Sequence, residues 1–129
     1  MPGSRSPFAY AVLRLVPRIE RGERLNVGVV LFSRQHGGFL GLRTQLDEQR
    51  LAVIAPGVSI DDVRAGLRAL ELIAAGDPAG GPLAALDPSE RFGWIVAPSS
   101  TMIQPGEVHT GLCDDPQAQL DALFQKLVA

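Results

Sequence analysis

The sequence predicts an α+β domain: an antiparallel sheet of four to five strands with two longer helices packed on one face. Three observations lead to this fold class. Strand-like apolar runs fill the first third of the chain, apolar residues at helical spacing follow, and an amphipathic helix closes the chain. The 129 residues, 46% hydrophobic and 20% charged, suit one core. We expect a disordered lead-in over residues 1–7 and a single domain over residues 8–129.

Three strands are expected in the first third of the chain, at residues 8–16, 25–33 and 39–43. Each is a short apolar run, and polar or glycine-rich turns separate them. Because consecutive strands with short connections usually pair, these three should form an antiparallel meander. Gly28 lies within the second run and predicts a bulge or a close approach of another backbone.

Helical spacing begins after the third strand. Thr44 and Asp47 resemble a capping box, and a short helix should follow them. Ser59 or Asp61 can cap a second helix, which should end at Gly76. The apolar face of that helix consists of Val63, Leu67, Leu70 and Ala74.

The middle of the chain alternates turn-forming residues with short apolar runs. Residues 77–86 are rich in glycine and proline and predict a surface loop. Residues 87–90, with Pro88 at the first helical position, predict one capped helical turn. Residues 92–97, which include the only tryptophan, Trp94, predict a fourth strand.

The last third of the chain ends in its most regular pattern. Residues 98–112 are polar and rich in turn-forming residues, although 101–103 or 108–110 can each add a short strand. Asp115 should cap a final helix with Pro116 at its first position. Apolar residues then recur at helical spacing: Leu120, Leu123, Phe124 and Leu127.

Charge is distributed unevenly along the chain. The formal net charge of −2 argues against a general polyanion binder. Residues 1–43 hold seven arginines and two glutamates, a net charge of +5, whereas residues 44–129 hold five basic and twelve acidic residues, a net charge of −7. The two halves can face each other within the fold. Together with the open edges of a small sheet, they also favour a homodimer.

Absent features narrow the class of protein. A lone cysteine excludes a disulfide framework and a multi-cysteine zinc site, and we expect neither a metal nor another cofactor. No run approaches the roughly 20 apolar residues of a membrane-spanning helix. The N-terminus lacks the apolar core of a signal peptide. We therefore expect a cytoplasmic protein with no membrane partner.

The densest cluster of reactive side chains lies between residues 99 and 115. Cys113 precedes a helix N-terminus, which can lower the pKa of a thiol, and His109 upstream of it is a candidate base. Alternatively, Cys113 is a small buried hydrophobe, and Asp114 and Asp115 only cap the helix. The catalytic candidates are thus Cys113 and His109. The binding candidates in this cluster are Ser99, Ser100, Thr101, Gln104, His109, Thr110, Asp114 and Asp115.

A second group of binding candidates is basic and consists of Arg14, Arg18, Arg21 and Arg24. Such a stripe can contact phosphates. Nucleic-acid binders usually pair such a stripe with exposed aromatic residues, however, and here Glu20 and Glu23 interrupt it. Alternating charges more often form a solvated surface, so nucleic acid is the weakest of the partner hypotheses.

Two stretches carry a family resemblance. Residues 10–32 (YAVLRLVPRIERGERLNVGVVLF) and residues 91–128, above all the run VHTGLCDDP at 108–116, are similar to an uncharacterised bacterial family. It is the domain-of-unknown-function family numbered three thousand and thirty-seven. The resemblance implies a small cytoplasmic protein, frequently encoded beside a serine/threonine kinase of the HipA type found in toxin–antitoxin systems. It implies no catalytic residue.

These observations favour a non-catalytic interaction module, a partner or modulator of a HipA-like kinase in a toxin–antitoxin-like pair. Its recognition surfaces would be residues 98–115 and the arginine-bearing loop at 18–24. Two alternatives stay open. One is a small enzyme that uses Cys113 and His109 for acyl or phosphoryl chemistry. The other is a weak nucleic-acid binder.

Overall fold

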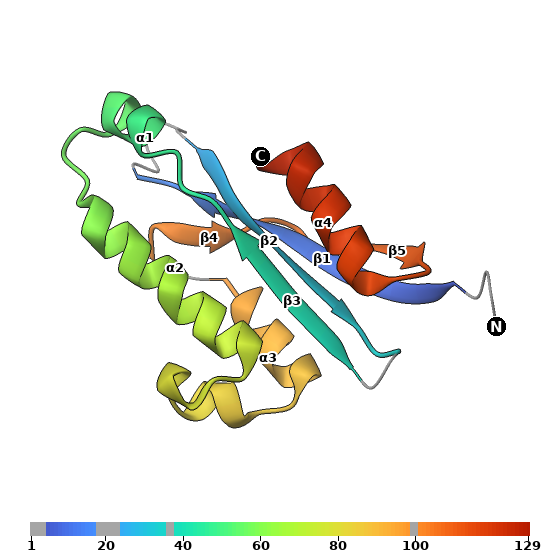
Figure 1. The fold of residues 1–129 in the computed structure, drawn as a ribbon. Helices are drawn as coiled ribbons and strands as arrows, with labels where there is room; N and C mark the ends of the chain where they lie inside the picture. The colour runs from blue at the N-terminus through green and yellow to red at the C-terminus, as the bar shows by residue number, and fades with distance from the viewer. Residues whose placement is uncertain (1–4, 18–23, 36–37, 99–100) are drawn as a thin grey trace.

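The computed structural model describes residues 5–17, 24–35, 38–98 and 101–129 (Figure 1). In chain order the elements are β1 (Ser6–Leu15), β2 (Leu25–Ser33), β3 (Phe39–Thr44), α1 (Glu48–Ile54), α2 (Ile60–Ala75), the 3-10 turns η2 (Pro78–Gly80) and η3 (Pro82–Ala85), α3 (Pro88–Ile95), β4 (Ile103–Pro105), β5 (His109–Cys113) and α4 (Pro116–Leu127). The predicted α+β class is confirmed, with an antiparallel sheet of five strands.

The sheet has the order β3-β2-β1-β4, and β5 also pairs with β1. β1, β2 and β3 form the predicted meander; Val30 on β2, for example, lies opposite Leu42 on β3. β4 faces residues 13–15 of β1, and β5 faces residues 6–10. β4 and β5 are therefore one interrupted strand along the outer edge of β1.

One extra residue separates β4 from β5. Leu13 pairs with Pro105 and Tyr10 pairs with His109, so three steps along β1 face four steps along the edge strand. Such a surplus is a local bulge. The N–H of Gly106 still donates to the carbonyl of Val12 at 2.8 Å, which keeps the bulge against β1.

Gly28 confirms both parts of its prediction. The register between β1 and β2 shifts next to it, where Leu13 pairs with Gly28 but Arg14 pairs with Asn26. A Cβ at position 28 would also lie 3.0 Å from the carbonyl oxygen of Arg43 on β3. The missing side chain thus lets the two backbones approach beside the bulge.

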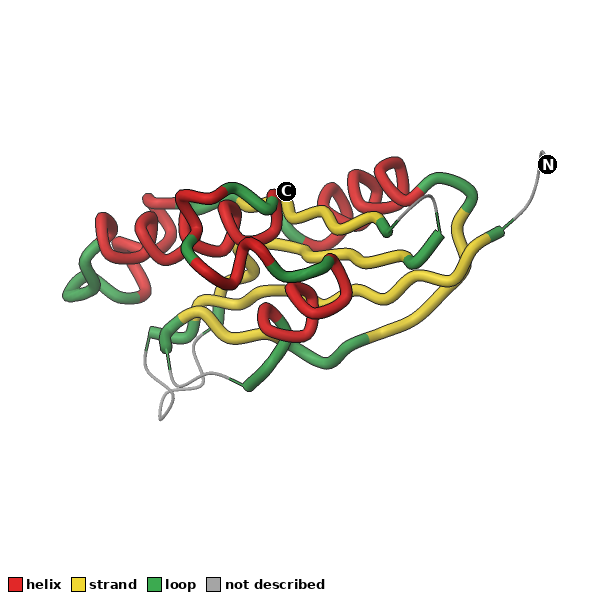
Figure 2. Tube along the Cα trace, turned by 90° about the horizontal axis from the view of Figure 1, so that it is seen from below, coloured by secondary structure: helices red, strands yellow, loops and turns green. Residues whose placement is uncertain are grey.

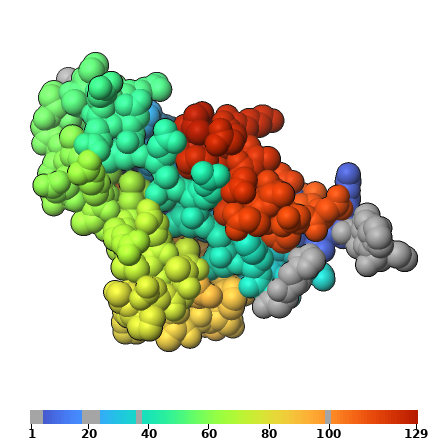
Figure 3. All heavy atoms as spheres, in the orientation of Figure 1, coloured from blue at the N-terminus to red at the C-terminus, as the bar shows by residue number. Residues whose placement is uncertain are grey.

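The two longer helices lie on opposite faces of the sheet, contrary to the expectation of one face. Adjacent residues of β3 point to different helices. Arg43 forms a 3.1 Å ion pair with Asp121 of α4 and lies over the Phe124 ring, whereas Thr44 donates a hydrogen bond to Glu71 of α2. Figures 1 and 3 show α4 on one side of β3 and α2 on the other.

Two hydrophobic cores result from this arrangement, because β1 and β2 are apolar on both faces. Figure 2 shows the strands running side by side with a helical segment in front of them. The core facing α1, α2 and α3 includes Ala11, Leu13, Val30, Leu51, Val63, Leu67 and Phe92. The core facing α4 consists of Phe8, Val29, Leu31, Cys113 and Leu120.

The predicted fourth strand at residues 92–97 is wrong, because α3 continues through most of it. Asp87 caps α3 by accepting a backbone N–H of its first turn at 2.9 Å. Phe92 and Ile95 are buried, whereas Trp94 between them is 59% exposed, which is the one-sided burial of a helix. In so short an apolar run, periodicity alone does not distinguish strand from helix.

The other helices begin at predicted caps, with one correction. Ser59 caps α2, Gly76 ends it with a φ of +70°, and Asp115 caps α4. Thr44 belongs to β3 and does not cap α1; Asp47 does so by accepting a backbone N–H. Because the backbone of Thr44 is part of strand β3, Thr44 cannot also begin the helix.

Three segments differ in extent from their predictions. β1 begins at Ser6, so the expected lead-in over residues 1–7 is too long, and Ser6 pairs with Cys113. The predicted loop at 77–86 contains the short turns η2 and η3. The two optional strands exist but begin one or two residues later than the proposed 101–103 and 108–110.

Candidate functional site

The structure does not bring the two catalytic candidates together. They occupy opposite ends of β5, where His109 pairs with Tyr10 and Cys113 pairs with Ser6. Four residues of extended strand span about 14 Å, too far for a base to take a proton from the thiol. Cys113 is 5% exposed and belongs, with Leu120 of α4, to the core that faces α4.

The electrostatics of Cys113 also disfavour a thiolate. Burial, followed by the charges of Asp114 and Asp115, raises the pKa of the thiol above its usual value of 9.0. The pKa lowering considered from the sequence is therefore wrong, because desolvation and two carboxylates act in the opposite direction. The His109 ring lies 5.3 Å from the Tyr10 ring, centroid to centroid, away from the thiol.

Thr101 and Gln104 hold the turn that leads into β4. The Thr101 hydroxyl donates to the carbonyl of Ile103 at 2.9 Å. The Gln104 side-chain amide donates to the carbonyl of Thr101 at 3.1 Å. These bonds give both side chains a structural role. Ser99 and Ser100 lie outside the described residues.

The remaining candidates of the 99–115 cluster are dispersed. Asp115 accepts the backbone N–H groups of Gln117 and Ala118 as the cap of α4. Asp114 is exposed beside it, and Thr110 is exposed on the edge strand β5. The cluster therefore follows one edge of the sheet and one helix end. Asp114 and Asp115 line one hollow, but the described candidates as a group do not converge on one pocket.

Of the four arginine candidates, two can be placed. Arg14 on β1 is the register partner of Gln104 on β4, so one basic candidate lies beside one candidate of the 99–115 cluster. Arg24 is exposed just before β2. Arg18 and Arg21 lie outside the described residues.

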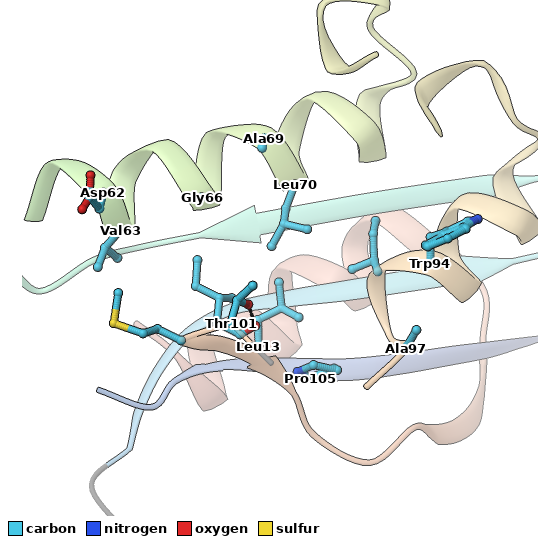
Figure 4. Close-up of a pocket in the computed structure, with 13 residues that line it drawn as sticks. Leu13, Asp62, Val63, Gly66, Ala69, Leu70, Trp94, Ala97, Thr101 and Pro105 are labelled. Carbon is cyan, nitrogen blue, oxygen red and sulfur yellow. Dashed lines mark hydrogen bonds between the residues drawn. The ribbon is translucent and has the colours of Figure 1, made fainter. Parts of the chain in front are cut away.

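The sequence did not predict an apolar groove of about 390 Å³ between α2, α3 and β4, although the binding candidate Thr101 lines it; we call it the α2–α3 groove. Leu13 and Pro105 of the sheet lie on one side, and Val63 and Leu70 of α2 on the other. Figure 4 shows Trp94 at one end of the groove. The volume is within the usual range of ligand pockets.

Small residues on α2 explain why this groove exists. Gly66 and Ala69 line it and lack the bulk that would fill it. An added Cβ at position 66 would lie 2.9 Å from the Ile103 Cδ1 atom of β4. A glycine inside an otherwise amphipathic helix was the available signal, and the strand assigned to residues 92–97 concealed the role of Trp94.

The part of the chain that the structure describes holds no candidate metal cluster and no candidate membrane span. Within it, no three His, Cys, Asp or Glu side chains form a group that could hold a metal ion. Likewise, none of its helices is both long enough and apolar enough to cross a membrane.

The fold and the groove define a small α+β domain with an antiparallel sheet between helices and an open apolar groove. The chain belongs to the family described as "Protein of unknown function (DUF3037)", whose model matches residues 10–128. The family resemblance found in the sequence is thereby confirmed. No curated protein and no solved structure matches the chain.

Proposed function

We propose that the protein is a non-catalytic interaction module whose α2–α3 groove binds an apolar segment of a partner protein. The observation that carries this proposal is the exposure of Trp94, a residue that is 59% exposed beside the groove. Large aromatic side chains next to an apolar hollow are typical anchors of protein interfaces. Covering such a surface removes apolar area from water, which favours binding.

Charge at the groove indicates the chemistry of the partner segment. Asp62, in the first turn of α2, lines the groove and forms no ion pair with another described residue. Its neighbour Asp61, in contrast, lies 4.0 Å from Arg64. A partner segment with an apolar side chain and a nearby Lys or Arg would complement both the groove and the Asp62 carboxylate.

A kinase is the partner class that we favour. The family resemblance implies a HipA-like serine/threonine kinase encoded nearby, and a modulator of such a kinase needs a docking site but no chemistry of its own. We therefore propose a cytoplasmic, toxin–antitoxin-like pair in which the α2–α3 groove receives a segment of the kinase.

Co-expression with the neighbouring kinase, followed by size-exclusion chromatography and titration, tests this proposal. Trp94 is the only tryptophan of the chain, so its emission should shift to the blue when a tryptophan-free partner peptide covers it. Elution as two separate peaks at micromolar concentration would exclude the kinase as partner.

A matched pair of variants tests the groove itself. Ala69→Phe fills the groove, whereas Ala65→Phe adds the same ring to an exposed position of α2 outside it. We expect Ala69→Phe to weaken binding about tenfold or more and Ala65→Phe to leave it unchanged. Asp62→Asn should weaken binding and reduce its salt dependence, with Asp61→Asn as control. Equal affinity for both phenylalanine variants would contradict the groove as the binding site.

A further inference from the structure

We propose that β5 is a self-pairing edge, through which two copies of the chain join their sheets antiparallel about a two-fold axis at Thr110. This inference concerns a different surface from the α2–α3 groove and does not depend on it. Among the described residues, β5 pairs only with β1, and no further strand lies beyond it. Figure 1 shows β5 at the outer edge of the sheet.

The backbone of β5 has hydrogen-bonding groups available on its outer side. Antiparallel residue pairs alternate between those that exchange two hydrogen bonds and those that exchange none. The Val12 carbonyl accepts from Gly106, so at a period of two Tyr10 and Phe8 also direct their backbone groups to the edge strand. Their partners His109 and Gly111 are then the bonded residues of β5.

It follows that Thr110 and Leu112 direct their N–H and C=O groups away from β1. Pro7, the partner of Leu112, agrees with this assignment, since it has no N–H and its carbonyl accepts from the Ser33 hydroxyl of β2 at 3.0 Å. The outer side of β5 therefore presents donors and acceptors at alternate residues, which is what an added strand requires.

The side chains along this edge of the sheet are exposed and largely apolar. Leu112 is 57% exposed and Val108 is 46% exposed, two of the few large hydrophobic residues with such exposure. Thr110 and Leu112 are spaced by two within β5, so they share one face of the edge, and the exposed Val108 lies directly before β5. On β1, Thr110 lies opposite the small Ala9, and Leu112 lies opposite Pro7.

The edge is complementary to itself in one register. With the two-fold axis at Thr110, Thr110 lies opposite Thr110 of the second copy. Val108 of each copy then lies opposite Leu112 of the other copy. Threonine pairs and apolar pairs across strands stabilise a sheet. The same register places the acidic Glu107 opposite Cys113, so no two like charges face each other. A second copy of this chain is therefore the occupant that the edge fits.

Disulfide trapping tests the register directly, in a Cys113→Ala background. Residues of a bonded antiparallel pair have Cα atoms about 5.5 Å apart, within the span of a disulfide. Thr110→Cys should therefore form a disulfide-linked dimer on oxidation. Leu112→Cys alone should not, because its two copies would be offset by four residues, about 14 Å, whereas Val108→Cys combined with Leu112→Cys should. Cross-linking of Leu112→Cys as fast as Thr110→Cys would overturn the proposed register.

Light scattering on the unmodified chain tests the dimer itself. We expect a mass of twice 13.7 kDa at micromolar concentration. Leu112→Lys should raise the dimer dissociation constant about tenfold or more, whereas Val53→Lys, at an 81% exposed position of α1, should not. Thr110→Pro removes an outward N–H without removing a bond to β1 and should also give monomers. Circular dichroism verifies that each variant is folded. A monomeric mass for the unmodified chain, or a dimer that survives Leu112→Lys, would refute the proposal.

Discussion

Cys113 illustrates how burial changes the chemistry of one side chain. The thiol is 5% exposed, and its pKa is raised above 9.0 first by desolvation and then by Asp114 and Asp115. Only the thiolate reacts with alkylating reagents. We expect iodoacetamide to modify the folded chain at pH 7 at least about tenfold more slowly than the urea-unfolded chain. Equal rates in the two states would contradict this account.

The same pKa shift makes a prediction about stability and pH. A raised pKa in the folded state means that the unfolded chain loses the thiol proton first as the pH rises. The contribution of Cys113 to the free energy of unfolding is therefore fully present below pH 9 and declines above it. Urea denaturation from pH 7 to 10 should show a steeper loss of stability for the unmodified chain than for Cys113→Ala. Parallel curves would disprove the shift.

Asp115 and Asp114 are neighbours with different roles. Asp115 accepts two backbone N–H groups at the start of α4, whereas Asp114 is exposed and caps nothing. Losing a helix cap usually costs about 1 kcal/mol. Asp115→Ala should therefore lower the free energy of unfolding by about 1 kcal/mol, and Asp114→Ala by less than about 0.5 kcal/mol. Chemical denaturation monitored by circular dichroism measures both, and an equal loss would show that the cap is unimportant.

At the scale of elements, the contact between β3 and α4 depends on Gly41. An added Cβ there would lie 2.7 Å from Leu120, which is inside the core facing α4, and 2.8 Å from Phe39, which packs against that core. We expect Gly41→Ala to destabilise the protein by about 1–3 kcal/mol through overpacking. Gly93→Ala is the matched control, since nothing lies within 4 Å and α3 should gain about 0.5–1 kcal/mol from the better helix former. Thermal melts should move in opposite directions.

The sequence predicted elements well where a local signal decided them. Ser59, Gly76 and Asp115 act at the ends of α2 and α4 as expected, because a cap depends on backbone geometry within a few residues. Residues 92–97 were mistaken for a strand, since an apolar run of that length suits either element. The helical periodicity of this run becomes clear only in the structure, where Phe92 and Ile95 are both buried in the core.

At the scale of the whole molecule, Arg91 joins parts that are distant in sequence. Its guanidinium on α3 donates to the carbonyls of Ile73 and Ala74 at the end of α2, at 3.0 and 2.6 Å, and to that of Leu86 at 2.9 Å. Arg91→Ala should lower the free energy of unfolding by about 2 kcal/mol. Arg50→Ala, at an exposed position of α1, should change it by less than about 0.5 kcal/mol. Similar urea midpoints for the two variants would contradict this role.

Which face of the sheet each longer helix covers could not be predicted from the sequence. β1 and β2 are apolar on both faces, yet the sequence predicted both longer helices on one face, which would leave the other apolar face uncovered. The alternation of Arg43 and Thr44 on β3, one toward α4 and one toward α2, resolves the conflict. Because a strand presents a new face at each residue, one strand can serve two cores.

By itself, the sequence determined the α+β class, the meander, the irregularity at Gly28, the ends of α2, the cap of α4 and the family, because each depends on local pattern. The tertiary structure alone decided that Cys113 and His109 lie at opposite ends of β5, that the helices sandwich the sheet, and that Gly66 and Trp94 border a groove. The physical reason is that which side chains lie close together depends on strand register and helix placement. Neither of these can be recognised from the residue type at a single position.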